Sequence, residues 1–363
     1  MKRSLIALAV LAAAGSASAQ STITLFGVAD AAIQYGSGSI SNLSRLGSGG
    51  LSSSILGFKG VEDLGGGMKA GFWLESGMTT DNGAGTATNT NNQTTGGALA
   101  GMNGSQGMVF NRRSTVSLGG AWGELRLGHD YTPQYLNQGG FDPFGNIGVG
   151  LSQTQASTIG GVTEVRASNS VSYLYGHGFN LDPLGTTGPN LQATYYMGEN
   201  NSNVANSDDG NGYGLRVGYN AGPLTAGVAT GRTQYLSGDI RITNAAFSYK
   251  FEVAKLIGIV TQEAVTGGAT SKGYLIGGTI PVGGAFGNLV RLAYSHAETD
   301  AAGNPQTGKF ALGYVYKFSN RTALYATVAF LNNSGPAAQS LNGSTTKAGD
   351  SSTGYDLGLK HSF

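Results

Sequence analysis

The sequence contains no cysteine, and charged residues make up only 11% of its 363 positions. The absence of cysteine excludes a framework of disulfides. The 21 basic residues nearly balance the 20 acidic ones, which argues against nucleic acid as a partner, because nucleic-acid-binding domains are strongly basic. Beyond Gln20 no apolar run reaches the roughly 18 residues that a transmembrane helix needs.

The first residues have the pattern of a secretory signal peptide. Lys2 and Arg3 form a positive start, the apolar run Leu5–Ala14 is too short to span a bilayer as a helix, and Ala17-Ser18-Ala19 is a small-x-small cleavage site. A buried N-terminal helix is the weaker alternative. We predict a signal peptide over 1–19, cleaved after Ala19, followed by one barrel domain over 20–363.

Glycine is the residue in excess, with 62 of 363 positions, about 17% against a usual ~7%. The sequence also has 17 tyrosines. A disordered chain would be poorer in aromatic residues and richer in charge, and collagen would show a strict triplet repeat. Glycine, tyrosine and alternating small apolar residues are typical of outer-membrane barrels, which combine an apolar outer face with a polar lumen.

Most of the mature chain alternates apolar and polar residues with a period of two, which indicates β-strands. In 307–318, Phe310, Leu312 and Tyr314 share one face while Lys309 and Lys317 share the other. We predict sixteen strands, an even number as in bacterial single-chain barrels. They are 22–35, 51–62, 67–78, 107–118, 123–130, 168–176, 190–198, 212–221, 224–235, 240–250, 253–264, 271–282, 285–298, 307–318, 321–331 and 353–363.

Short turns alternate with longer polar loops along the chain, as in barrels with periplasmic turns and external loops. An open sheet of this size cannot lie in hydrocarbon, because its edges would be unpaired. We therefore predict an all-β fold, a sixteen-stranded antiparallel transmembrane β-barrel. The segment from Tyr131 to about Gly160 has no regular period, and such long irregular segments are often functional.

Several segments resemble the trimeric general porins of Gram-negative outer membranes, especially those of beta-proteobacteria. The most specific is LGFKGVEDLGGG; TLFGVADAAIQY, FDPFGNIGVG, RASNSVSYLYG and the terminal YDLGLKHSF add to it. The resemblance spans nearly the whole mature chain. It implies a homotrimer in the outer membrane, in contact with lipid and lipopolysaccharide, with the third loop of the barrel, residues 131–160, folded into each bore.

The resemblance also implies a transverse field between a basic barrel wall and acidic groups on or near that loop. Wall charges act strongly at a constriction because water is partly excluded, and basic rings favour anions whereas acidic rings favour cations. The candidate residues of the pore constriction are Lys59, Glu75, Arg112, Arg113, Arg126, Asp142 and Arg166.

Strand parity leaves one choice among these residues open. Val116 and Leu118 share a face with Arg112 and not with Arg113, so either arginine is a candidate for the bore. The chain also departs from the family pattern. Ile55 stands where an arginine is usual before LGFKG, His129 where an arginine is often found, and Asn146 where an acidic residue is common. The sequence does not decide between anion and cation selectivity.

Other chemistry has little support. The four histidines have no metal-ligand spacing, no nucleophile elbow is present, and GNIGVG lacks the strand–turn–helix context of a phosphate loop. Tyrosines near strand ends, Tyr131 among them, suggest an interfacial aromatic girdle.

We predict a passive channel for small hydrophilic solutes and ions, with no catalysis, cofactor or metal. A substrate-selective porin for anions or organic acids is the first alternative, and an adhesive or structural barrel the second.

Overall fold

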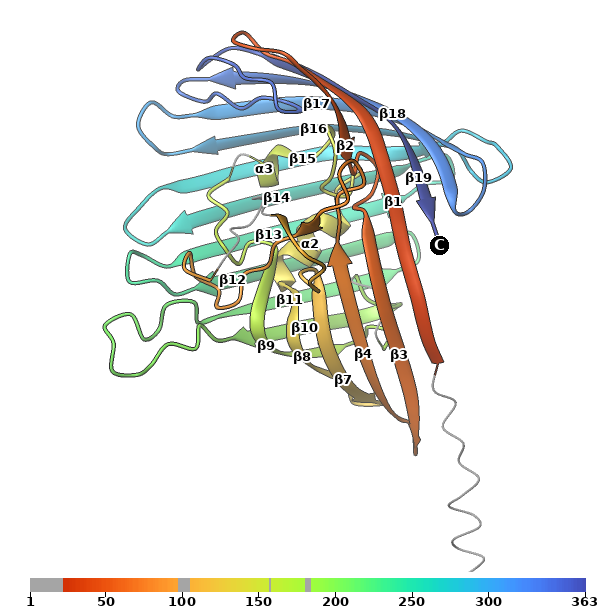
Figure 1. The fold of residues 1–363 in the computed structure, drawn as a ribbon, viewed down its shortest axis with the longest axis vertical. Coiled ribbons are helices and arrows are strands. Elements are labelled where there is room, and N and C mark those ends of the chain that lie inside the picture. The colour runs from red at the N-terminus through yellow and green to blue at the C-terminus, as the bar shows by residue number, and fades with distance from the viewer. Residues whose placement is uncertain (1–21, 97–104, 157, 180–183) are drawn as a thin grey trace, which may run out of the picture.

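The computed structural model describes residues 22–96, 105–156, 158–179 and 184–363, and the predicted signal peptide with its cleavage site lies outside them (Figure 1). Strands dominate the chain. The strands are β1 (Thr22–Ser37), β2 (Leu43–Ser48), β3 (Ile55–Gly65), β4 (Met68–Gly77), β5 (Gly85–Thr86), β6 (Ser105–Gln106), β7 (Arg113–Gly120), β8 (Gly123–Tyr131), β9 (Arg166–Tyr175), β10 (Gly188–Tyr196), β11 (Gly212–Ala221), β12 (Leu224–Thr233), β13 (Ile240–Lys250), β14 (Lys255–Val265), β15 (Thr270–Pro281), β16 (Leu289–Thr299), β17 (Gln306–Lys317), β18 (Thr322–Ser334) and β19 (Ser352–Ser362), and the helices are α2 (Pro133–Gly140) and α3 (Gln153–Ala156).

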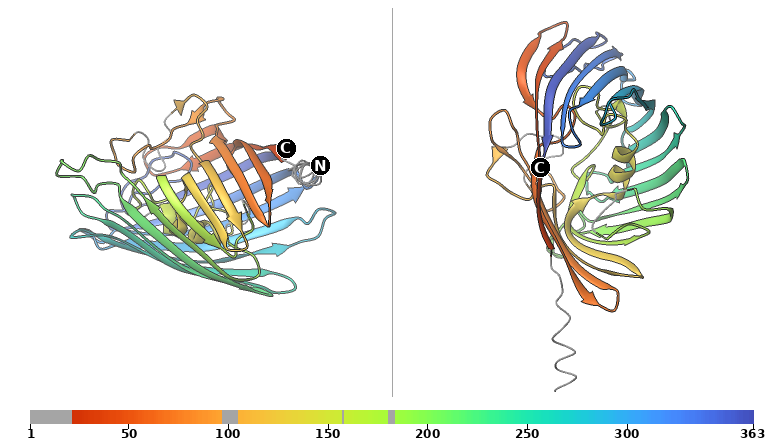
Figure 2. Two further views of the ribbon diagram at one scale, coloured as in Figure 1. Left: turned by 90° about the horizontal axis from the view of Figure 1, so that it is seen from below. Right: turned by 90° about the vertical axis from the view of Figure 1, so that its right-hand side faces the viewer.

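The large sheet closes on itself. Each strand pairs antiparallel with its neighbours in sequence, and β1 pairs on one side with β19 and on the other with β2 and β3. Because β2 and β3 pair with successive stretches of β1, the 17 segments of the described sheet form sixteen barrel strands. The predicted sixteen-stranded antiparallel barrel is confirmed, and Figure 2 shows the ring.

The two faces of the wall differ in chemistry. On β11, Leu215, Val217 and Tyr219 point outward and are 41–53% exposed, whereas Arg216 between them is fully buried inside. A polar interior and an apolar exterior are the reverse of a soluble sandwich and suit a barrel surrounded by acyl chains. Among the described residues, no helix is both long and apolar enough to cross a bilayer.

The second barrel strand is interrupted between β2 and β3, where the sequence predicted one strand over 51–62 after a loop. The cause is Asp30, which is fully buried. Its carboxylate accepts hydrogen bonds from the backbone N–H groups of Leu51 (3.0 Å) and Ser52 (2.7 Å) and from the hydroxyl of Tyr325. These bonds hold residues 49–54 out of the ladder and bring Leu51 and Ser52 into the bore.

Two further details differ from the sequence prediction. The fourth barrel strand begins at Arg113 rather than at 107, and the central segment contains the two short helices. Helix α2 has no apolar stripe in its sequence. Its buried residues are mostly polar and include Gln134, Asn137 and Gln138. A helix that packs on a polar wall has a polar buried face, so amphipathic periodicity cannot reveal it.

We expect Val217→Arg to lower the free energy of unfolding by about 2–4 kcal/mol, because an arginine at mid-strand on the lipid face lies deep in the hydrocarbon. Leu224→Arg, on the same face but at the turn end of β12, is the matched control and should cost only about 0–1 kcal/mol. The measurement is reversible urea unfolding in lipid vesicles. Equal costs for the two variants would contradict the assigned outer face.

Candidate functional site

The segment that joins β8 to β9, residues 132–165, is called the inner loop below. Phe141, Phe144 and Val149 of this loop are at most 3% exposed and pack in one cluster with Ala311 and Ala329 of the inner wall. Figure 2 shows the loop, in yellow and olive, within the ring of strands. The loop therefore packs against side chains that face the interior of the barrel.

Polar contacts fix α2 to the wall. The Asn137 amide donates to the carbonyl of Gly227 (3.2 Å) and to Asn244 Oδ1 (2.7 Å) and accepts from Arg216 Nε (3.0 Å). The backbone also comes close here, since a Cβ added at Gly231 would lie 2.5 Å from Gln134 Oε1. Glycine on the wall thus makes room for the helix.

The middle of the inner loop is anchored to the part of the wall formed by β17 and β19. Lys309 Nζ of β17 donates to the carbonyls of Val149 (3.2 Å) and Leu151, and Asp356 Oδ2 of β19 accepts from the backbone N–H of Val149 (2.8 Å). These bonds replace water at buried polar groups, whose desolvation would otherwise be costly. They hold the loop away from the wall formed by β3, β4, β7 and β8.

A cavity of about 470 Å³ remains between the inner loop and that wall, and it is called the loop cavity below. It contains three of the residues that the sequence suggested, Glu75, Arg112 and Arg113. Its lining is Leu51, Ser52, Ser53, Ile55, Trp73, Glu75, Arg112, Arg113, Tyr131, Tyr135, Leu136, Gly139, Gly140, Gly145, Asn146 and Ile147.

Arg112, Glu75, Tyr131 and Arg166 form one hydrogen-bonded cluster at the loop cavity. Arg112 Nε lies 2.6 Å from Glu75 Oε1, and its Nη2 donates to the Tyr131 hydroxyl at 2.6 Å. Arg166 donates to the same hydroxyl at 2.8 Å and lies 4.3 Å from the ring centre. Within the described residues Arg166 has no carboxylate within 4 Å, so its positive charge is not compensated by a direct ion pair.

Arg113 also points inward, because Val116 and Leu118 face outward and are 56% and 39% exposed. Its guanidinium lies 4.6 Å from the centre of the Trp73 ring and 3.7 Å from Asp130. Both arginines therefore lie in the bore: Arg113 by strand parity, and Arg112 because it precedes β7 and bends inward. Lys59 lies beside them, 4.6 Å from the centre of the same tryptophan ring.

Arg126 and Asp142 lie elsewhere. Arg126 is buried on the inner face of β8, where it pairs with Glu124 (2.9 Å) and Asp130 (2.7 Å), and it does not line the loop cavity. Asp142 lines a second cavity of about 350 Å³, called the turn-side cavity because it reaches the turn after β17. Its charged lining residues are Asp142, Arg291, Lys317, Arg321 and Lys360.

Sequence reasoning did not find Tyr131 and Trp73. The girdle interpretation of Tyr131 is wrong, because its hydroxyl receives hydrogen bonds from two arginines in the bore. The pairing of β8 with β9 shifts by one residue between Gly128 and Asp130, and such a bulge re-aims the side chains beyond it. Trp73 pairs directly with Lys59 on the neighbouring strand. Because paired residues point to the same face of a sheet, the inward assignment of Lys59 could have identified Trp73 as inward-facing too.

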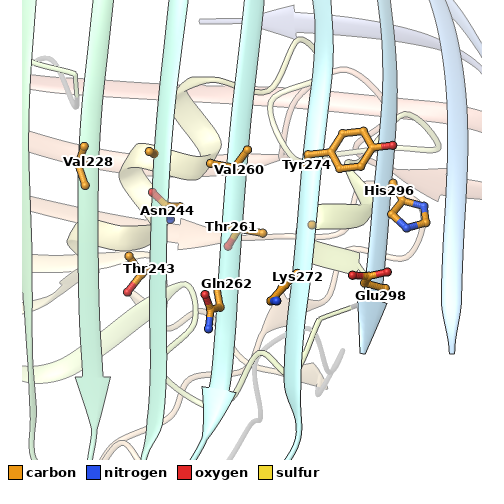
Figure 3. A pocket seen from close by; sticks show the side chains of 12 residues that line it. Val228, Thr243, Asn244, Val260, Thr261, Gln262, Lys272, Tyr274, His296 and Glu298 are labelled. Atoms are coloured by element: carbon orange, nitrogen blue, oxygen red, sulfur yellow. The ribbon is translucent and has the colours of Figure 1, made fainter. Parts of the chain in front are cut away.

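A third cavity, of about 510 Å³, lies on β12–β16 but opens to the outside of the barrel (Figure 3). Val228, Val260 and Tyr274, which line it, are 44–58% exposed on the outward face. It is a groove in the lipid-facing surface and is not part of the passage. His296 lies in this groove, and no group of three or more metal-ligating side chains occurs within the described part of the chain.

Two carboxyl groups, Glu164 of the inner loop and Glu263 of β14, lie near each other at the end of the loop. Glu263 of β14 is fully buried and accepts a hydrogen bond from the backbone N–H of Gly160 at 2.7 Å. Burial, together with the neighbouring Glu263, raises the pKa of Glu164 from 4.5 to about 8. Glu164 is thus largely protonated at neutral pH in the folded protein.

A closed sixteen-stranded barrel with an apolar exterior and a charged, partly open interior defines a transmembrane channel. Comparison with known proteins agrees. The chain matches the model of the Gram-negative porin family over residues 5–336. It is 36% identical to outer membrane porin protein 32 of Delftia acidovorans, with 100% of both chains covered. It is also 26% identical to an outer membrane porin protein of Bordetella pertussis, with 92% of this chain and 95% of the relative covered.

The fold is similar to that of a solved structure, an anion-selective porin from Comamonas acidovorans. The TM-score is 0.79 at 32% identity, covering 95% of this chain and 100% of the other. The chain therefore belongs to the Gram-negative porin family. It is an outer-membrane channel for passive diffusion of small hydrophilic solutes, and it is not an enzyme.

We expect the stability of the barrel to fall as pH rises from about 4.5 to about 8, because Glu164 keeps its proton in the folded state but loses it in the unfolded state over this range. Glu164→Gln should flatten this part of the profile of urea midpoint against pH. Glu199→Gln, on an exposed loop residue, is the matched control and should keep the wild-type profile. An unchanged profile in Glu164→Gln would contradict the assignment.

Proposed function

We propose that the loop cavity and the turn-side cavity together form the narrowest part of the channel, and that this part prefers anions. The two cavities share Leu51, Ser52 and Gly145 in their linings, so they adjoin. One observation supports the preference for anions: six basic side chains line the two cavities against two acidic ones. These are Arg112, Arg113, Arg291, Lys317, Arg321 and Lys360 against Glu75 and Asp142.

Both acidic side chains are already engaged. The Glu75 carboxylate receives Arg112 Nε at 2.6 Å and Trp73 Nε1 at 3.0 Å. Asp142 accepts from the backbone N–H groups of Phe144 (2.7 Å) and Ser152 (3.2 Å), and burial raises the pKa of its carboxyl group. A passing ion therefore meets the basic groups at an effective dielectric constant below that of water, where their charge acts more strongly.

Of the seven residues suggested by the sequence, five contribute to the proposed anion preference. Four supply positive charge, and one orients an arginine. Arg112, Arg113 and Arg166 provide positive potential, and Lys59 adds to it, while Glu75 orients Arg112. Arg126 is matched by two carboxylates and has a structural role. Asp142 chiefly holds the inner loop in shape through its two backbone hydrogen bonds.

The assembly and maturation of the protein are part of the same proposal. We expect a homotrimer that contacts outer-membrane lipid and lipopolysaccharide, in line with the porin family and with the trimer form of OmpT from Vibrio cholerae, which shares this fold at 13% identity and a TM-score of 0.62. We also expect Gln20 to be the first mature residue. Sedimentation of the detergent-solubilised protein tests the first expectation, and its intact mass tests the second.

We expect Arg112→Ala and Arg166→Ala each to lower the anion-to-cation permeability ratio roughly two- to fivefold, equivalent to about 0.4–1 kcal/mol of ion–wall interaction. The ratio follows from the reversal potential of planar bilayers under a KCl gradient. The matched control is Arg241→Ala, which removes an exposed arginine on the outer face of β13 and should leave the ratio unchanged.

Two results would overturn this proposal. One is a wild-type reversal potential that shows cation preference. The other is an unchanged ratio in both Arg112→Ala and Arg166→Ala, which would remove these two arginines from the ion path.

A further inference from the structure

The loop cavity is unusually apolar for the narrow part of an aqueous channel. Besides its charges, it is lined by the half-buried side chains of Leu51, Ile55, Trp73, Leu136 and Ile147. Ile55 and Trp73 come from the wall, whereas Leu136 and Ile147 come from the inner loop. Hydrocarbon therefore lines the cavity on both sides of the passage.

The aromatic rings of the cavity are held by the same groups that supply its charge. Tyr131 and Tyr135 stack with ring centres 5.4 Å apart and an angle of 10° between the planes. The Trp73 ring lies 4.6 Å from the guanidinium of Arg113, and its N–H is fixed by Glu75. Flat, oriented rings of this kind favour contact with another planar group.

Arg112 can receive one further carboxylate through Nη1, because Glu75 and Tyr131 are bound through Nε and Nη2. Arg112 is oriented by Glu75 through Nε and by Tyr131 through Nη2, and a guanidinium has five N–H donors in a rigid plane. Guanidinium groups bind carboxylates with directional, charge-assisted hydrogen bonds. The volume of about 470 Å³ lies within the range of small-molecule sites.

Two departures of the sequence from the pattern of the resembled family fall in this cavity. Ile55 occupies a position where an arginine is usual, and Asn146 one where an acidic residue is common. Both polar atoms of the Asn146 amide are buried and have no hydrogen-bond partner within the described residues.

We propose that the loop cavity is a binding subsite for small monocarboxylates that carry an aromatic or branched hydrocarbon group. The carboxylate lies at Arg112, and the hydrocarbon lies among Ile55, Trp73 and Ile147. This inference rests on the proposed anion preference and adds a solute class to it. A site that combines one charge contact with apolar contacts retains an amphipathic anion longer than an inorganic anion of the same charge.

The test uses the mature porin in planar bilayers and three probes in a KCl background: benzoate, acetate and benzyl alcohol. We expect benzoate to reduce the chloride current in a saturable manner, with a half-maximal concentration at least about fivefold below that of acetate. Benzyl alcohol, which has the ring without the charge, should have little effect. The three probes separate the contribution of the ring from that of the carboxylate.

Ile55→Asn keeps the charge of the cavity and removes apolar surface, so it should reduce the advantage of benzoate over acetate about threefold without changing the reversal potential in KCl. Leu236→Asn, an exposed residue that lines neither the loop cavity nor the turn-side cavity, is the matched control and should change neither quantity.

The inference is overturned if benzoate and acetate act at the same concentration on the wild-type channel, or if benzyl alcohol acts as strongly as benzoate. Failure of the anion preference itself would appear separately, as a cation-selective reversal potential in KCl without any added probe. The two failures are therefore distinguishable in one set of recordings.

Discussion

The closure of the sheet is the constraint on which the rest of the structure depends. In hydrocarbon, every backbone N–H and C=O group needs a partner within the protein, and the pairing of β1 with both β19 and β3 supplies the last of them. Closure divides the side chains of each strand into one set that faces lipid and another that faces the interior. The apolar outer face and the charged inner face then follow from the period-two sequence.

A polar interior changes how the inner loop can be held. In a soluble protein a helix docks through an apolar stripe, but here α2 docks through Asn137 and Gln134 against Arg216, Asn244 and glycine backbone. Only the middle of the loop makes an apolar cluster, where Phe141 and Phe144 meet small alanines of the wall. These anchors leave the loop cavity open between the inner loop and the wall formed by β3, β4, β7 and β8.

Period-two reasoning could predict the barrel and several residues of the site. Lys59, Glu75 and Arg126 lie on the inner face as strand parity indicated. Parity fails where the ladder is irregular: Tyr131 lies beyond a register shift, Arg112 precedes its strand, and Asp30 interrupts the second strand through bonds to residues distant in sequence. The side chains that line the loop cavity are thus positioned by bulges and loop anchors, which a local sequence pattern does not reveal.

If solutes pass between the inner loop and the basic wall, as proposed above, a group attached where the two cavities adjoin must obstruct the current. Ser52 lines both cavities at the point where they adjoin, and the chain has no cysteine of its own, so Ser52→Cys gives a single reactive thiol there. The most direct measurement is the single-channel conductance of this variant before and after a water-soluble, sulfonate-bearing thiol reagent is added. We expect a stepwise loss of conductance on labelling, and full labelling with unchanged conductance would contradict a solute path at Ser52.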